Sequence, residues 1–405
     1  MRLSDHLHLS YCTNVHPGEG LGAAREAVEA HLPAVASRLR GPLAAAAAAG
    51  LGAGLRLGAA AADALARPEA LRALRNTLEE RGGYVFTVNG FPHGDFAAPR
   101  VKENAYEPDW ATGERLRYTL TLARALAALP GPPTRTISTV AGGFEPSGYA
   151  ALDPARAAAL SAGLCEAARG LARLEGETGV SVRLALEPEP WTTLERTSDA
   201  VDFFTRWLWP AEPLTRRYLG LCYDACHQAI AFEDPEEAWR GLEAAGVEVL
   251  KVQLSNALAI RPPTPAARAA LLSFSEPRYL HQVTARGSGG GLLRALDLPD
   301  LPAPAPEWLA APEWRCHFHV PLWWEGAGEG VGTTAAHWRA LAALVAARAA
   351  RAAAGEGVWV PHVEVETYSW GVIPLREREG LDDVYGCVAR ELEVAAVALG
   401  GADFC

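Results

Sequence analysis

The sequence predicts an α/β fold, a (β/α)8 TIM barrel with one insertion between its late strands. Strand-like and helix-like segments alternate along the 405 residues, a pattern typical of βα units around a parallel sheet. The run 218–223 lacks polar alternation, as strands that are covered on both faces do. A doubly wound open sheet is the alternative, but no glycine-rich phosphate turn follows an early strand.

The segments follow one another in a regular order. Helical periodicity appears over 21–43, 60–81, 112–129, 153–176, 198–209, 333–354 and 381–399. Asp153 and Pro154 mark the N-cap and first residue of the fourth of these helices. Strand-like runs occupy 6–14, 51–58, 84–91, 134–143, 180–190, 218–228, 247–256, 314–322 and 359–370.

A barrel has places for only eight of these nine runs. The run 314–322 is the likeliest extra strand, because it follows a proline-rich stretch of low regularity and lies over the barrel mouth in this interpretation. We therefore expect one barrel over residues 1–405, with an irregular insertion over 262–312 near the mouth.

Composition excludes several classes of protein. The net charge is -11, with 37 basic and 48 acidic residues and no Lys/Arg block, which disfavours nucleic acid as a partner. The start, MRLSDHLHLSYC, has no apolar core of a signal peptide. Several glycines and Arg56 interrupt the apolar stretch 43–66, so we expect no membrane span. Seven cysteines without CxxC spacing predict core thiols in a cytoplasmic protein.

One strand, YLGLCYDACHQ at 218–228, ends in residues suited to chemistry. Asp224 and His227 follow the buried run at the end where parallel barrels place their ligands. Oxygen and imidazole donors together suit a divalent metal. The pattern alone is weak, since Asp224 also fits a helix cap and His227 a packed core histidine.

Similar residues end the neighbouring barrel strands. Glu187, Asp224, Gln253 and Glu366 follow four successive strands of the barrel. Converging carboxylates repel one another unless protons or a cation neutralise them. The sequence therefore favours a divalent-metal site, while N-caps and salt-bridge partners remain the alternative for one or two of these acids.

The series LALEPEP, CYDACH, KVQLSN and VETY resembles the xylose isomerase-like barrel superfamily, which includes sugar-phosphate isomerases, ketose 3-epimerases, inosose-processing enzymes and endonuclease IV. The resemblance implies a divalent metal held by Glu187, Asp224 and Glu366. Gln253 stands where the family has its metal-binding histidine, which favours manganese or magnesium over zinc. In this interpretation His319, from the extra strand, replaces the missing nitrogen ligand.

More narrowly, HLSYCTNVHPGE, TVNGFPHGDF, VKENAYEPDW and HVEVETYSW resemble the Ebo-type metabolite-traffic proteins of that superfamily. Relatives are encoded beside a prenyltransferase, a cyclase-like protein and hydrolases, and are linked to moving or processing secondary metabolites. This resemblance implies a secondary-metabolite pathway. Pathway proteins and a second copy of the chain are open as partners.

The superfamily chemistry implies an isomerase or epimerase of a sugar, sugar phosphate or cyclitol. A metal would stabilise an enediolate, with Glu187 and Glu366 as the acid and base on opposite faces of the substrate. The residues expected to hold substrate hydroxyls are His227, His317, Asn89, His93 and His8.

Two other functions fit the same barrel. Gln253 at the metal-histidine position keeps a non-catalytic metabolite carrier open. A phosphoester hydrolase of the endonuclease IV type needs more metal-binding histidines, and both Gln253 and the absence of a histidine in STVAGG count against it.

Overall fold

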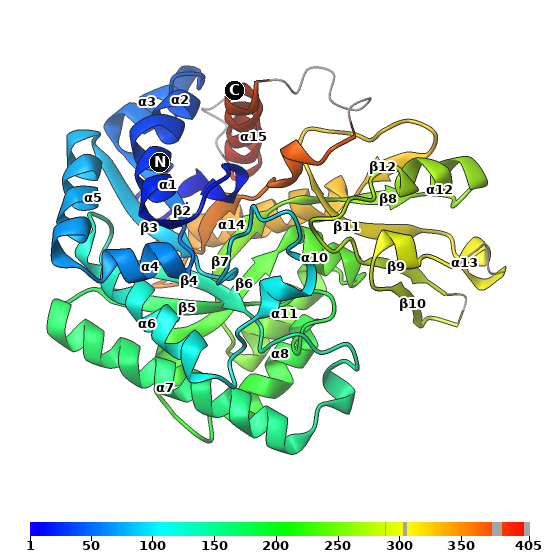
Figure 1. Cartoon of the computed structure of the whole chain (residues 1–405), viewed down its shortest axis with the longest axis horizontal. Coiled ribbons are helices and arrows are strands. Elements are labelled where there is room, and N and C mark those ends of the chain that lie inside the picture. Colours follow the sequence, from blue (N-terminus) through cyan, green and yellow to red (C-terminus); the bar gives the residue numbers. More distant parts are fainter. Residues whose placement is uncertain (288, 303–305, 375–382, 401–405) are drawn as a thin grey trace.

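Eight parallel strands form the centre of the molecule (Figure 1). The computed structural model describes residues 1–287, 289–302, 306–374 and 383–400. The strands follow the order β1-β13-β7-β6-β5-β4-β3-β2, and a parallel bridge from Cys12 to Gly54 joins the two edges into a nearly closed barrel. Their bounds are β1 Leu9–Tyr11, β2 Leu51–Arg56, β3 Gly83–Asn89, β4 Thr134–Val140, β5 Ser181–Glu187, β6 Leu219–Asp224, β7 Val249–Leu254 and β13 His362–Val365. The predicted TIM barrel is confirmed.

Helices lie between the strands and cover the outside of the barrel. The main ones are α1 Gly20–Glu26, α2 Leu32–Ala36, α3 Gly41–Ala49, α4 Ala59–Leu65, α5 Pro68–Glu80, α6 Gly113–Ala128, α7 Pro154–Thr178, α8 Thr197–Phe203, α10 Ala225–Ile230, α11 Pro235–Ala245, α14 Ala335–Ala353 and α15 Val384–Ala398. Asp153 caps α7 through a hydrogen bond from the Ala155 N–H, as predicted. The single helix expected over 60–81 is wrong, because Pro68 starts a new helix there.

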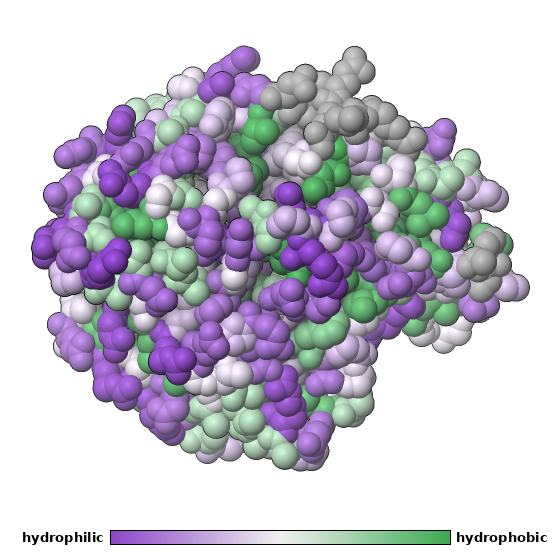
Figure 2. Space-filling view, in the orientation of Figure 1, coloured by the Kyte–Doolittle hydropathy of each residue, from purple (hydrophilic) through white to green (hydrophobic). Residues whose placement is uncertain are grey.

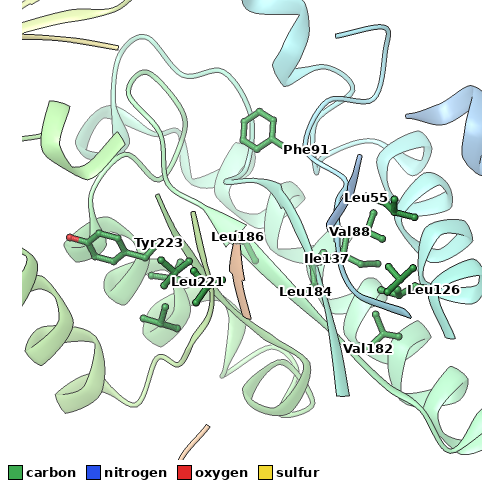
Figure 3. Packing of buried hydrophobic residues seen from close by; sticks show 14 of the residues in the cluster. Leu55, Val88, Phe91, Leu126, Ile137, Val182, Leu184, Leu186, Leu221 and Tyr223 are labelled. Carbon is green, nitrogen blue, oxygen red and sulfur yellow. The ribbon is translucent and has the colours of Figure 1, made fainter. Parts of the chain in front are cut away.

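Apolar side chains fill the layer between strands and helices. Leu55 of β2, Val88 of β3 and Ile137 of β4 gather near Leu126 of α6 (Figure 3), and all four are buried. Full burial of each such side chain contributes roughly 1.5–3 kcal/mol. The rigid layer that results holds the strand ends in place.

The insertion is larger and more regular than the sequence predicts. It forms a five-stranded antiparallel sheet of order β10-β9-β11-β8-β12, which projects as a lobe beside the barrel (Figures 1 and 2). Its elements are β8 Asn256–Ile260, α12 Pro265–Leu272, β9 Val283–Arg286, β10 Leu292–Ala295, α13 Pro306–Ala310, β11 Trp314–Val320 and β12 Val331–Thr333. Residues 262–312 are therefore not irregular throughout, because four-residue strands form inside them. β11, the expected extra strand, lies in this second sheet.

Two further expectations concern cysteines and membranes. Six cysteines in the described part of the chain are buried, as a core role requires. None of the helices in the described ranges is both long and apolar enough to cross a bilayer. Cys405 and the predicted start of the last helix at residue 381 lie outside the described residues.

Candidate functional site

The candidate site lies where the barrel strands end. In the parallel ladder, Asp224 of β6 lies beside Gln253 of β7, and Gln253 lies beside Glu364 of β13. Alternate residues of a strand point to the same face, so Glu364 and Glu366 both point into the barrel. Glu187 is the last residue of β5 and is also buried.

Three carboxylates meet at this end of the barrel. Oxygen atoms of Glu187, Asp224 and Glu366 lie within 4.8 Å of one another, and all three residues are buried. Oδ1 of Asp224 accepts hydrogen bonds from the His227 N–H at 3.0 Å and the Ser255 hydroxyl at 2.8 Å. Asp224 thus caps α10 and also belongs to the cluster. Oδ2 of Asp224 and Oε2 of Glu187 have no hydrogen-bond partner among the described residues.

Two amides hold the third carboxylate. Oε1 of Glu366 accepts a hydrogen bond from Nδ2 of Asn14 at 2.7 Å and another from Nδ2 of Asn89 at 2.9 Å. Asn89 was predicted in the site. Asn14 was not, although a polar residue shortly after the first strand was a usable signal. The two amides fix the orientation of the carboxylate.

The crowding of acids changes their protonation. Burial, together with the Asp224 charge, raises the pKa of Glu187 to about 8. Burial and the charges of Glu187 and Asp224 raise the pKa of Glu366 well above its usual value. Burial alone would raise the pKa of Asp224, but His227, His319 and the hydrogen bonds to Oδ1 bring it below its usual value. The cluster holds protons near neutral pH that a cation would displace.

Gln253 occupies the central place in this ladder without a partner. Both its amide oxygen and its amide nitrogen are buried and lack a hydrogen bond to any described residue. A buried unpaired polar atom costs about 1–3 kcal/mol. The side chain is therefore available to a ligand, as its predicted place among the metal ligands requires.

Three histidines adjoin the carboxylates. His227 comes from α10, and His317 and His319 come from β11 of the inserted sheet. Ligand atoms of Asp224, His227 and His319 lie within 4.8 Å of one another, as do those of Glu189, His227 and His317. Glu189 was overlooked as a site residue, although it follows Glu187 by two positions.

A small pocket opens above these groups. Its walls contain the predicted residues Glu187, Glu366, His227, His317, His319 and Asn89, and also Asn14, Glu189, Phe91, Pro92, Phe96, Ala105 and Tyr368. The aromatic side chains come from segments far apart in sequence, so no local pattern identified them. Tyr368 contacts both Phe96 and His319 through its ring, which joins the aromatic wall to the histidines.

Two predicted substrate-binding residues lie elsewhere. His8 precedes β1 and contacts Tyr84 and His362 at the amino ends of the strands, the opposite end of the barrel. His93 packs edge-on against Tyr118 of α6 and does not line the pocket. The structure does not bring either residue to the site.

An ion pair lies inside the barrel below the carboxylate cluster. Lys251 and Glu364 are both fully buried and form a direct ion pair. Nζ of Lys251 also lies 3.3 Å from Oγ of Ser138. Burial would lower the pKa of Lys251, but the Glu364 charge outweighs it and raises that pKa.

Comparisons with known proteins support the fold. No family model matches the chain, and no curated protein matches it in sequence. A xylose isomerase-like TIM barrel protein from Mycobacterium smegmatis, solved in complex with magnesium, superposes with a TM-score of 0.50 at 12% identity, over 98% of each chain. This likeness shows a TIM barrel.

Two further solved structures align over nearly the whole chain, with lower scores. The probable 3-DHS dehydratase AsbF from Bacillus anthracis has a TM-score of 0.48 at 11% identity, over 96% of this chain and 98% of that one. D-psicose 3-epimerase from Clostridium cellulolyticum H10, solved with D-tagatose, has a TM-score of 0.47 at 12% identity, over 97% of each chain.

Proposed function

We propose that the chain is a divalent-cation-dependent isomerase or epimerase of a small polyhydroxylated carbonyl compound. The observation that carries the proposal is the buried cluster of Glu187, Asp224 and Glu366, whose oxygens lie within 4.8 Å of one another. Three carboxylates so close together need protons or a cation.

The donor set fits a hard divalent cation. All three clustered side chains offer oxygen, and Gln253 offers its amide oxygen from the neighbouring strand. Oxygen donors suit magnesium or manganese, and the Mycobacterium smegmatis barrel was solved with magnesium. A cation bound here would polarise the substrate carbonyl and acidify the adjacent C–H bond.

Glu187 and Glu366 are suited to move the proton. Glu187 ends β5 and Glu366 follows β13. Strands β6 and β7 separate β5 from β13 in the barrel. Without a bound cation, burial and the Asp224 charge raise the pKa of Glu187 to about 8, so the surroundings of this carboxyl favour a bound proton. Asn14 and Asn89 hold Glu366 in a fixed orientation. One carboxylate removes the proton from the carbon next to the carbonyl, and the other returns a proton. Return to the opposite face of the same carbon inverts its configuration, whereas return to the neighbouring carbon moves the carbonyl group.

The pocket favours an uncharged substrate. Among the described residues, no lysine or arginine lines it, whereas Phe91, Phe96 and Tyr368 form an apolar side. A phosphate group would find no cationic side chain, while the C–H face of a sugar or cyclitol ring packs well on aromatic rings. We therefore prefer a free sugar or cyclitol over a sugar phosphate. A place in an Ebo-type pathway is the narrower part of the proposal, supported by sequence resemblance alone.

A carrier of the same metabolite is the second candidate. Gln253 favours it, because an amide is a weaker ligand than the imidazole that the superfamily has there. Both functions need the pocket, but only the enzyme needs proton transfer. An experiment that follows a proton therefore separates them.

The test is deuterium exchange at carbon. Manganese-loaded or magnesium-loaded protein is incubated in D2O with free ketohexoses and cyclitol ketones, and NMR follows the loss of C–H signal next to the carbonyl. The enzyme should catalyse exchange, and Glu187→Gln and Glu366→Gln should abolish it. Glu391→Gln is the matched control, because Glu391 is a buried acid on α15 that does not line the pocket. Binding of a sugar without exchange in the wild-type protein would favour the carrier.

A further inference from the structure

Four residues other than glycine adopt a positive φ in the described part of the chain. Three of them, Lys102 (φ 39°), Trp191 (φ 65°) and Phe232 (φ 58°), lie in the connections that follow β3, β5 and β6. The fourth, Glu329, lies in the inserted lobe, residues 256–333. A positive φ strains a residue with a large side chain, so neighbouring groups must hold it in place.

The lobe holds the strained residue after β5. The guanidinium carbon of Arg294, on β10, lies 4.0 Å from the ring centroid of Trp191. The same guanidinium donates a hydrogen bond to the Glu195 carboxylate at 2.7 Å. Within this turn, the N–H and the hydroxyl of Thr192 donate to the Glu189 carbonyl oxygen at 3.0 and 2.8 Å. Arg294 therefore fixes the turn that brings Glu189 to the pocket.

The lobe holds the strained residue after β6 in the same way. The guanidinium carbons of Arg315, on β11, and Arg286, on β9, lie 4.1 and 5.1 Å from the ring centroid of Phe232. Both distances are within the range of an attractive cation–π contact. Arg286 also donates a hydrogen bond to the Phe232 carbonyl oxygen at 3.1 Å. The ring and the backbone of this residue are thus both held by lobe arginines.

Helix α10 ends just before this strained residue and packs against β8 and β11 of the lobe (Figure 1). The last carbonyl oxygens of a helix have no partner inside it. Arg315 donates to that of Ala229 at 2.7 Å, and its positive charge is favourable at a helix C-terminus. Asp224 caps the other end of the helix. Because α10 carries His227, Arg315 fixes the direction from which this imidazole enters the pocket.

The connection after β3 is joined to the lobe through its backbone. The Lys102 N–H donates to the Arg278 carbonyl oxygen of the lobe at 2.9 Å. The Lys102 ammonium forms an ion pair with Asp297, also of the lobe. This residue begins the 3-10 helix over 102–106, which brings Ala105 to the pocket. Each of the three strained connections therefore contacts the lobe.

We propose that the inserted lobe is a clamp that positions the connections carrying Glu189 and His227, with Arg294 and Arg315 as the positioning residues. Neither arginine is among the described residues that line the pocket, so each acts through a residue that does. The carboxylate cluster comes from the barrel strands, so the clamp acts on substrate binding and not on the cation. The effect on substrate rests on the proposed isomerase function, whereas the effect on the connections does not.

Backbone amide hydrogen exchange of the full chain, followed by mass spectrometry, tests the clamp without substrate. Arg294→Ala should speed exchange in peptides covering 188–195, and Arg315→Ala should do so in peptides covering 227–234. We expect changes of about tenfold, because each variant loses a cation–π contact and a hydrogen bond that oppose local opening. Peptides of β5 and β6 should exchange at the wild-type rate.

The matched control is Arg268→Ala. Arg268 is an arginine of α12 that donates to the Pro302 carbonyl oxygen at 3.1 Å, inside the lobe itself. Both connections should exchange at the wild-type rate in this variant.

Kinetics of deuterium exchange at carbon test the positioning role. In the manganese-loaded protein, both clamp variants should raise KM for the sugar about tenfold with little change in kcat, because misplaced pocket side chains weaken binding. Both variants should bind Mn²⁺ as wild type does, which also shows that the barrel is folded. A loss of folded protein alone would lower kcat and leave KM unchanged.

Wild-type amide exchange in both connections of the variants would overturn the clamp. Faster amide exchange with an unchanged KM would overturn the positioning role, because the arginines would then only stabilise the fold. Wild-type protein that exchanges no deuterium at carbon would contradict the proposed function instead. In that case the amide exchange of the two connections still decides whether the lobe is a clamp.

Discussion

Toward the amino ends of the barrel strands, buried polar side chains have partners. Nδ1 of His8 lies 2.9 Å from the Tyr84 hydroxyl, and Nδ1 of His362 lies 2.9 Å from that of Thr136. Toward the carboxyl ends, Oε2 of Glu187 and both amide atoms of Gln253 have no partner among the described residues.

Under the proposed function, the difference separates polar groups that stabilise the fold from polar groups that bind a ligand. Each unpaired buried polar group lowers the free energy of unfolding by about 1–3 kcal/mol. A folded chain tolerates this loss at a binding site, because a bound ion or molecule pairs with the group and removes the loss. The Lys251–Glu364 pair marks the boundary between the two regions, because its charges compensate each other.

The largest effect should follow from breaking that ion pair. Lys251→Met leaves Glu364 as an uncompensated buried carboxylate, and the loss of one partner of a buried pair costs about 3–5 kcal/mol. Urea unfolding should show this loss, and the double variant Lys251→Met/Glu364→Gln should recover most of it. If Lys251→Met were as stable as wild type, the ion pair would not stabilise the boundary between the two regions.

The next effect is the pH dependence of the metal-free protein. The pKa of Glu187 is raised from 4.5 to about 8 on folding, so its contribution to stability is fully present below pH 4.5 and is lost as pH rises toward 8. One pKa unit corresponds to about 1.4 kcal/mol, so wild type should lose roughly 3 kcal/mol relative to Glu187→Gln between pH 4.5 and pH 7. Unfolding curves at several pH values measure this difference. If the stabilities of the two proteins changed with pH in the same way, the pKa of Glu187 would not be raised on folding.

A smaller effect should follow from changing the metal preference of the carboxylate site. Gln253→His places an imidazole at the centre of the carboxylate ladder, where it supplies the nitrogen ligand that zinc prefers. Zinc affinity of the carboxylate site should rise about tenfold, equivalent to ~1.4 kcal/mol. Competition titration against manganese measures it. An unchanged zinc preference would place Gln253 outside the first coordination sphere.

The smallest effect concerns Asn14. Asn14→Ala removes one of the two amide donors to Glu366, a contact worth about 0.5–1.5 kcal/mol. Stability should change by no more than this amount, while deuterium exchange slows because Glu366 is less well oriented. Asn104→Ala is the matched control, because Asn104 is an exposed residue of the 3-10 helix over 102–106 and does not itself line the pocket. Exchange at the wild-type rate would remove Asn14 from the site.

The barrel was predictable because its strands are buried on both faces. Apolar runs such as 184–186 and 219–223 stand out from their surroundings, and the polar residue that follows each run marks the site. The strands β9 and β10 span only four residues each. Such short antiparallel segments depend on their partners, so the local sequence of 262–312 does not reveal them.

A site residue was predictable from the sequence only where it lies at the carboxyl end of a recognisable barrel strand. Glu187, Asp224 and Glu366 met that condition. His8 did not, because it lies at the beginning of its strand, and a polar residue there faces the opposite end of the barrel. Asn14 and Glu366, which are joined by a hydrogen bond in the site, are 352 positions apart. Only the folded chain brings them together.

The most direct test of the cation site is equilibrium dialysis of metal-free protein against manganese. Wild type should retain one equivalent, and Glu187→Gln/Glu366→Gln should retain none, while Glu391→Gln binds as wild type does. Equal manganese retention in wild type and the double carboxylate variant would contradict the account, as would no retention in wild type. In either case the unpaired groups at the carboxyl ends would not belong to a manganese site.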